Sequence, residues 1–421
     1  MKKRIYILYC LILTLLLGTI VSWGYDKSDM PRILKVGLKY GDTSASMVDL
    51  NSSSGFDFGY YDDKGFNILF NLIEYRDITI RKDGYYKNQG GSYIDNYDNS
   101  SDSTIGPYHV QVGDEFSSKD EMENFLNTLG NSSNYYPVYE DGWKIWTGLY
   151  ATKGAAEQFV DSNKKINDKN LKVVNPNNGR VVVLSKNETV LFIYDSSQRE
   201  YNFRAFLDKD GNDIISVDGK KYRGEIIIRR YTGSDMTVIN YLGLDEYLYG
   251  VLPKEMSGDW PIEALKAQAV AARNYAVANA HKHAEYGFDV CSTIDCQVYG
   301  GYDVEKPRTT SAVDETTGKI LTYDGKIVSA FFHSNSGGRT ENSENIWSIS
   351  LPYIRGVDDE FSIGAPNSAW TKIYTPAQIQ NVLNANGMSI GSITNIYAEE
   401  YSENGRVLSL KVEDSSKEIT L

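Results

Sequence analysis

Residues 261–280 read PIEALKAQAVAARNYAVANA, and this stretch decides the fold of the domain around it. Pro261 suits the first turn of a helix, where a backbone N–H has no partner in any case, and Asp259 just before it is a candidate cap. Such a high alanine content leaves little side-chain volume between a helix and its neighbours. The stretch therefore predicts one long, closely packed helix, with a buried stripe at Ile262, Leu265, Ala269, Ala272 and Ala276.

Two basic residues lie on an adjacent face of this helix. Lys266 and Arg273 are seven residues apart, which is about two helical turns. They form either a solvated basic stripe or a pair that points into a cleft, and the spacing does not decide between these alternatives.

Most of the remaining chain has the pattern of strands. Short strand-like runs fill residues 32–84 and 172–240, separated by Gly, Asp, Asn and Ser turns. Residues 85–106 are rich in Gly, Asn, Asp, Ser and Tyr, which predicts a linker. Residues 107–165 show the order strand, helix, strand, strand, helix, with Ser117 or Ser118 as the cap of the first helix. We predict an α+β fold, in which a β-rich domain (32–84 and 172–421) with one long Ala-rich helix carries a small inserted α/β domain.

Charge and hydropathy limit the function and location of the chain. Its 421 residues have a net charge of −13, so no basic surplus exists to bind nucleic acid. Residues 5–23 carry no charge and are long enough to span a membrane once, after the basic residues 1–4. We expect a single-pass signal anchor in the cell membrane, with residues 1–4 in the cytoplasm and the bulk of the chain outside it.

Two cysteines lie outside the predicted membrane span in a C-x4-C pattern. Cys291 and Cys296 allow three alternatives: a disulfide, two free thiols, or a zinc site. Zinc requires further ligands, and His281 and His283 lie a short distance upstream. The pattern alone leaves the three alternatives open.

A single acidic residue, Glu255, lies in the stretch GVLPKEMSGDW, residues 250–260, which we expect to be non-helical. A glutamate just before a helix is either a solvated or capping residue or a functional acid, and the stretch alone does not decide between these alternatives.

Six segments within residues 224–360 resemble the SpoIID/LytB family in matching order. They are INYLGLDEYLYGVLPKEM, WPIEALKAQAVAARNYA, DVCSTIDCQVYGG, AVDETTGKILTYDGK, FFHSNSGGRTENSENIW and LPYIRGVDD. The resemblance implies an exported, membrane-anchored lytic transglycosylase with its catalytic part at 224–415. Such enzymes cut peptidoglycan glycan strands, already stripped of stem peptides by a partner amidase, and leave 1,6-anhydro-MurNAc ends during sporulation. The alternative within the same family is a non-catalytic, glycan-binding enhancer of a cell-wall amidase.

The resemblance also implies roles for individual residues. Glu255 matches the family's catalytic acid, and no cofactor is required for catalysis. Ordinary glycosidases use two carboxylates, but one acid suffices in the family's reaction because the sugar's own C6 hydroxyl closes on C1. This requires an apolar setting that raises the pKa of the acid, and Tyr247, Tyr249, Met256 and Trp260 lie near Glu255 in the sequence. Some family members carry zinc near the two cysteines, with a histidine where this chain has Asp295, so Cys291, Cys296 and His283 are candidate ligands of a structural zinc. The implied glycan-binding residues are Lys266, Gln268, Arg273, Tyr275, Gln297, Tyr299, His333, Ser334 and Ser336.

The inserted unit at 107–165 resembles a SPOR domain, a module that binds bare glycan strands. The similarity rests on its element order and on short segments in its first strand and its hairpin. It implies a second glycan contact through Gln111, Trp143 and Tyr150.

Overall fold

The computed structural model describes residues 30–89, 92–95, 104–130, 134–207, 211, 213–231, 235–365 and 368–421. The chain divides into two compact units, Met1–Ala330 and Phe331–Leu421, each of which is described by itself. The anchor predicted at residues 5–23 lies outside the described residues. Within the described ranges, no helix is both long and apolar enough to cross a membrane.

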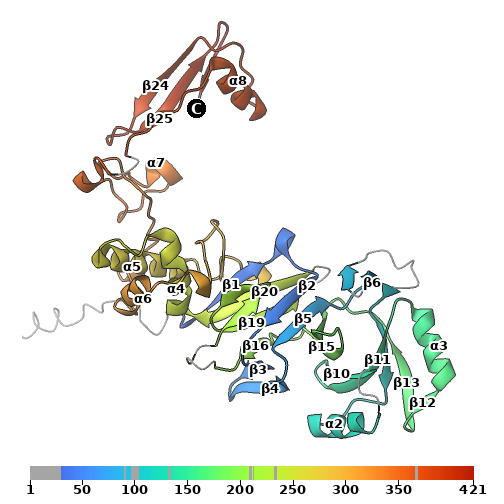
Figure 1. Ribbon diagram of the computed structural model, residues 1–421. Coiled ribbons are helices and arrows are strands. Elements are labelled where there is room, and N and C mark those ends of the chain that lie inside the picture. Colours follow the sequence, from blue (N-terminus) through green and yellow to red (C-terminus); the bar gives the residue numbers. More distant parts are fainter. Residues whose placement is uncertain are drawn as a thin grey trace, which may run out of the picture. The chain divides into compact units, whose positions relative to one another are not determined.

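Two sheets enclose the main core of the first unit (Figure 1). Phe58 of one sheet lies 4.8 Å from Phe192 and 4.6 Å from Tyr194 of the other, measured between ring centroids. The seven-stranded sheet has the order β21 (Val290–Cys291), β1 (Ile33–Lys39), β20 (Met236–Gly243), β19 (Glu225–Arg230), β16 (Asn202–Ala205), β3 (Phe56–Asp62) and β4 (Gly65–Leu72).

The second sheet has eleven strands and joins the inserted unit to the core. Its order is β12 (Lys165–Ile166), β13 (Lys169–Val174), β9 (Tyr108–Val112), β11 (Trp143–Tyr150), β10 (Tyr135–Tyr139), β15 (Val190–Asp195), β14 (Arg180–Ser185), β5 (Asp77–Lys82), β2 (Met47–Asn51), β17 (Ile215–Val217) and β18 (Lys220–Tyr222). The strand-rich α+β class expected from the sequence is confirmed.

The inserted unit has the predicted element order, followed by the two strands β12 and β13. β9, α2 (Lys119–Asn127), β10, β11 and α3 (Lys153–Asn163) precede β13, and the sheet order β13-β9-β11-β10 is that of a split βαβ unit. Ser118 caps α2 by accepting a hydrogen bond from the Glu121 amide. The sheet of the inserted unit continues into the sheet of the core, because β10 pairs in parallel with β15.

The segment predicted as a linker, 85–106, contains regular structure. β6 (Tyr86–Gln89) pairs with β7 (Ser92–Asp95) and with β8 (Thr104–Ile105) in a small antiparallel sheet. Tyr86 is fully buried and donates a hydrogen bond to the Ser46 carbonyl, which ties this sheet to the core.

Three helices form a layer at one end of the first unit: α4 (Leu244–Glu255), α5 (Ile262–Ala278) and α6 (Pro307–Asp314) (Figure 1). The predicted helix α5 is confirmed, and its Leu265, Ala269, Ala272 and Ala276 are fully buried. Asp259 does not cap it: Pro261 occupies the cap position, and no side-chain hydrogen bond closes that turn.

Residues 250–255 are helical, which corrects the expected non-helical stretch. Pro253 lies inside α4, close to its C-terminal end. A proline removes one backbone hydrogen bond and crowds the preceding turn, and near a helix end few further bonds depend on that turn. The helix therefore continues through Pro253 and ends at Glu255.

The second unit is small. It contains α7 (Glu344–Trp347), α8 (Pro376–Ala385) and an antiparallel sheet of β24 (Asn395–Tyr401), β25 (Val407–Glu413) and β26 (Glu418–Thr420). Leu383, Ile390 and Val412 form its core. Before it, the first unit ends in a short hairpin of β22 (Thr322–Tyr323) and β23 (Lys326–Ile327).

Candidate functional site

Glu255 is the last residue of α4, and its side chain is exposed. Among the described residues, none makes a hydrogen bond or ion pair with its carboxylate. Desolvation by the surrounding protein raises the pKa of Glu255 above the usual value for glutamate. The helix end adds to this effect, because the negative end of a helix dipole disfavours a carboxylate relative to its protonated form. Glu255 is therefore an accessible acid that tends to keep its proton.

The four residues expected to form an apolar setting for Glu255 differ in their burial and in their contacts. Tyr247 is fully buried and packs against Tyr299, and the Tyr249 hydroxyl donates a hydrogen bond to Asp314 at 2.6 Å. Met256 is half-buried, and Trp260 is 51% exposed. Trp260 is thus the large aromatic side chain in this stretch that solvent and ligands can reach.

The two basic residues of α5 have different environments. Arg273 is fully buried and donates to Asp245 Oδ1 from Nη2 at 2.8 Å and from Nε at 3.2 Å. Its guanidinium also donates to the carbonyls of Val313 and Lys319, each at 3.3 Å. Such a buried, paired cation is a packing element, so the implied glycan contact through Arg273 has no support in the geometry.

Lys266 is a surface residue. Its Nζ lies 2.8 Å from Glu263 Oε1 and 2.7 Å from Glu315 Oε2. These exposed ion pairs leave its head group accessible to solvent, as expected for a solvated basic residue.

Two glutamine amides have donors that no described residue uses. Gln297 is buried, its Oε1 accepts from the Tyr247 hydroxyl, and its Nε2 has no partner among the described residues. The buried Nε2 of Gln268 on α5 is likewise without a partner in the described ranges. Unsatisfied buried donors are uncommon, so these two amides are candidates for donating to a ligand.

The implied tyrosines have structural contacts. Tyr299 is 2% exposed and donates to Asn240 Oδ1 at 2.9 Å. Tyr275 is half-buried, and its hydroxyl lies 3.4 Å from the Asp295 carbonyl. Tyr299 is therefore a core residue, whereas Tyr275 borders the cysteine segment.

His333, Ser334 and Ser336 belong to the second unit and are described within it alone. His333 and Ser334 are exposed. Ser336 is 5% exposed and donates to Asp359 Oδ2 at 2.6 Å, next to the Ser362 hydroxyl. Ser336 therefore orders its own turn.

The three residues expected to bind glycan in the inserted unit do not share one surface. Gln111 accepts a hydrogen bond from the indole of Trp146 at 3.3 Å. Trp143 packs edge-on against Phe70 of the core, and Tyr150 contacts Phe159 of α3. The structure gives them three separate contacts.

The two cysteines are free thiols that gather with other potential metal ligands. One donor atom each from His283, Cys291, Asp295 and Cys296 lies within 4.8 Å of the others. His283 Nε2 is 3.4 Å from Cys296 Sγ and 3.2 Å from Asp295 Oδ2, and Cys291 Sγ is 3.9 Å from Asp295 Oδ2. The disulfide alternative is therefore not what the structure shows.

Zinc fits this donor set. Tetrahedral zinc with ligands at 2.0–2.3 Å has ligand atoms roughly 3.3–3.8 Å apart, close to the separations found here. Asp295 stands where some family members have a histidine, and its carboxylate is the fourth donor of this cluster. His281, the other candidate, lies 3.0 Å from Asp289 instead.

A pocket of about 680 Å³ in the first unit was not anticipated from the sequence. Its wall combines the face of α6 with the η4 turn (Tyr302–Val304) and Arg223, which forms an ion pair with Glu305 at 2.8 Å. Arg223 is distant in sequence from residues 302–314, which supply the rest of the lining, so no local pattern brings the two together. It is lined by Arg223, Tyr302, Asp303, Glu305, Lys306, Pro307, Thr310, Ser311 and Asp314.

Known proteins share the segment that carries Glu255 and the cysteines. Residues 232–323 match the family described as "SpoIID: Stage II sporulation protein". The chain is 32% identical over 234 residues to an uncharacterised protein of Brachyspira hyodysenteriae, covering 54% of this chain and 63% of that protein. It is 37% identical over 166 residues to the amidase enhancer of Bacillus subtilis (39% of this chain, 22% of that protein).

The stage II sporulation protein D of Bacillus subtilis is 35% identical over 182 residues, covering 39% of this chain and 53% of that protein. The chain thus spans less than two thirds of the length of each of these relatives. The matched family segment contains α4, α5, α6 and the four potential metal ligands His283, Cys291, Asp295 and Cys296. These elements build the candidate site. Within this segment, the chain is similar to the SpoIID family.

Proposed function

We propose that this protein is a lytic transglycosylase that cleaves peptidoglycan glycan strands between MurNAc and GlcNAc, with Glu255 as its acid and base. The observation that carries the proposal is the raised pKa of an accessible, unpaired carboxyl at the end of α4. A role in the bacterial cell wall agrees with the similarity of residues 232–323 to the SpoIID family.

One carboxyl is enough for this reaction. Protonated Glu255 donates its proton to the glycosidic oxygen as the bond to C1 breaks. The C6 hydroxyl of MurNAc then closes on C1, and the Glu255 carboxylate takes the proton of that hydroxyl. Atoms and charges balance without a second carboxylate, in contrast to hydrolysing glycosidases, which need one to activate water or to form a covalent intermediate.

We further propose a structural zinc held by His283, Cys291, Asp295 and Cys296. Its chemical contribution would be to fasten the segment 283–296, because Cys291 lies in β21, which pairs with β1. Gln297 follows directly, so the same fastening would position its unpartnered amide. We place the protein outside the cytoplasm, beside its wall substrate, with residues 5–23 as its anchor.

Digestion of amidase-treated peptidoglycan tests the catalytic role of Glu255. Mass spectrometry should find 1,6-anhydro-MurNAc ends after incubation with the purified chain and none with Glu255→Gln. Glu263→Gln, an exposed acid at the start of α5, is the matched control and should retain activity. Equal product release by wild type and Glu255→Gln would show that Glu255 is not the catalytic acid.

The second candidate is a non-catalytic, glycan-binding enhancer of a cell-wall amidase, favoured by the similarity to the amidase enhancer of Bacillus subtilis. It predicts no anhydro ends from the chain alone, but faster release of stem peptides when the chain is added to an amidase. Measuring both products in one digest separates the two functions.

A further inference from the structure

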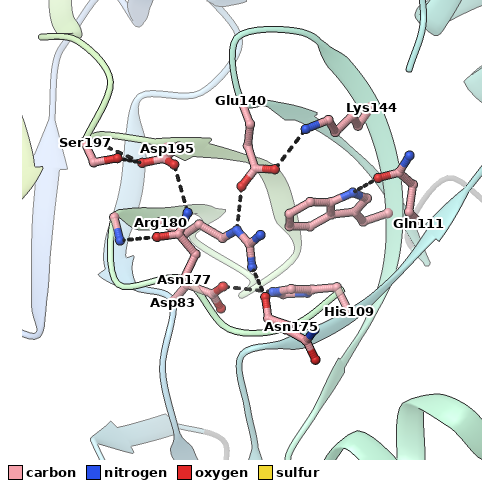
Figure 2. Close-up of polar contacts among 12 residues, drawn as sticks. Asp83, His109, Gln111, Glu140, Lys144, Asn175, Asn177, Arg180, Asp195 and Ser197 are labelled. Carbon is pink, nitrogen blue, oxygen red and sulfur yellow. Dashed lines mark hydrogen bonds and ion pairs between the residues drawn. The ribbon is translucent and has the colours of Figure 1, made fainter. Parts of the chain in front are cut away.

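A buried polar joint holds the inserted unit on the core. Figure 2 shows two polar pairs that cross this boundary, Asp83–His109 and Arg180–Glu140. Asp83 follows β5 and Arg180 begins β14 of the core, whereas His109 lies in β9 and Glu140 follows β10 of the inserted unit. His109 is 0%, Asp83 4% and Arg180 6% exposed.

The Asp83–His109 pair is buried, and all of its polar side-chain atoms except Asp83 Oδ1 have a partner among the described residues. His109 Nε2 donates to Asp83 Oδ2 at 2.9 Å, and Nδ1 lies 2.9 Å from both the Tyr136 hydroxyl and the Gly148 carbonyl. Although burial opposes it, the charge and hydrogen bond of His109 lower the pKa of Asp83, so the pair holds a carboxylate without solvent.

Arg180 contacts two residues of the inserted unit and one residue of the core. Its Nε donates to Glu140 Oε1 at 2.6 Å, and its guanidinium lies 4.5 Å from the centroid of the Trp146 ring. Its carbonyl accepts from the Asp83 amide at 3.0 Å, which links the two polar pairs. Trp146 is 1% exposed, so the core covers the centre of the inserted sheet on this side.

Apolar contacts continue the joint along the β10–β15 pairing. Val138 is in register with Ile193, and the boundary cluster consists of Tyr136, Val138, Trp146, Val182, Leu184 and Ile193. Apolar surfaces alone tolerate small slips in register. Buried charge pairs do not, because removing either partner leaves an uncompensated charge in a dry interior.

We propose that the inserted unit is a rigid extension of the core, locked by the Asp83–His109 and Arg180–Glu140 pairs, rather than a module on a tether. The lock covers the part of the sheet face opposite α2 and α3 that contains His109 and Trp146. Gln111 is half-buried beside this part, and both ends of its amide are engaged, by Trp146 and by the Gly113 carbonyl. A ligand of the inserted unit must therefore bind outside the covered part.

Hydrogen exchange followed by mass spectrometry of the purified chain tests the lock. In the wild type, amides of β9 and β11 should exchange together with those of β14 and β15, as one cooperative unit. Asp83→Asn should speed exchange in β9, β10 and β11 by about 100-fold and leave β19 and β20 unchanged. Arg180→Gln should act in the same direction and provides a second test if Asp83→Asn does not fold.

Glu157→Gln is the matched control, since it removes an exposed ion pair with Lys153 on α3 of the same unit. It should leave all rates unchanged. The proposal is overturned if the wild-type inserted unit exchanges independently of the core, or if the lock variants leave its exchange unchanged. Equal loss of protection throughout the first unit would also overturn it, because the pairs would then be ordinary core contacts.

Discussion

Replacing Arg273 should unfold the helical layer rather than weaken glycan binding. Arg273→Met keeps most of the aliphatic length and removes the charge with its donors. It leaves Asp245, whose side chain is 27% exposed, without a counter-ion. It also removes one donor each from the carbonyls of Lys319 and Val313, although Val313 still accepts from the Thr316 hydroxyl. Breaking a buried pair by removing one partner costs roughly 3–5 kcal/mol. Because water reaches Asp245 in part, we expect about 3 kcal/mol, the lower end of that range.

Urea unfolding of the purified chain measures this change in free energy, and hydrogen exchange in α5 and α6 locates it. Lys266→Met, two turns earlier on the same helix, is the matched control. Its ion pairs with Glu263 and Glu315 are exposed, so its removal should change the free energy of unfolding little. Glycan binding, measured with folded protein, should be alike for wild type and Arg273→Met.

The opposite pattern would refute this reasoning. If Arg273→Met unfolds like the wild type but binds glycan strands at least about tenfold more weakly, a loss of about 1.4 kcal/mol in binding, then Arg273 contacts substrate. The burial and the four hydrogen bonds to Asp245, Val313 and Lys319 would not describe the state that binds glycan.

Three further predictions concern pH, packing and metal. Because the pKa of Glu255 is raised, its acid form persists above the pH at which an ordinary glutamate ionises. The initial rate of anhydro-end formation should therefore fall as the pH rises through the raised pKa. A rate that increases over that pH range would contradict the general-acid role. Gly250→Ala should destabilise the chain in urea by about 1–2 kcal/mol, because its Cβ would lie 2.5 Å from the buried ring of Tyr299 and this overpacking exceeds the helix-propensity gain of about 1 kcal/mol. Elemental analysis should find zinc in a one-to-one ratio with the purified wild-type chain and none in Cys291→Ser. Wild-type protein that contains no zinc would contradict the proposed zinc site.

Helix α5 was predictable because its signal is local. The alanine stripe repeats at helical spacing within one segment, and all four of its central members are buried. The roles of Lys266 and Arg273 were not, since they depend on partners elsewhere. Arg273 meets the end of α6, some 40 residues further along the chain, and no spacing within α5 reports on that contact.

The inserted unit shows the same division between local and distant information. Its order of strands and helices follows from alternation, capping and turns, including the Ser118 cap. Its attachment to the core does not, because the register of Val138 with Ile193 and the pairing of Asp83 with His109 join distant segments. A buried histidine in a strand has no sequence signature that distinguishes it from an exposed one.

The helical conformation of residues 250–255 strengthens the case for Glu255. Pro253 lies near the end of α4, where the loss of one backbone hydrogen bond costs little. In a loop, Glu255 would need apolar neighbours to hold its proton. At the C-terminal end of a helix, desolvation and the helix dipole both disfavour its ionised form. A lone carboxyl placed in this way can act as an acid without a second carboxylate to raise its pKa, which is the condition that a one-acid mechanism requires.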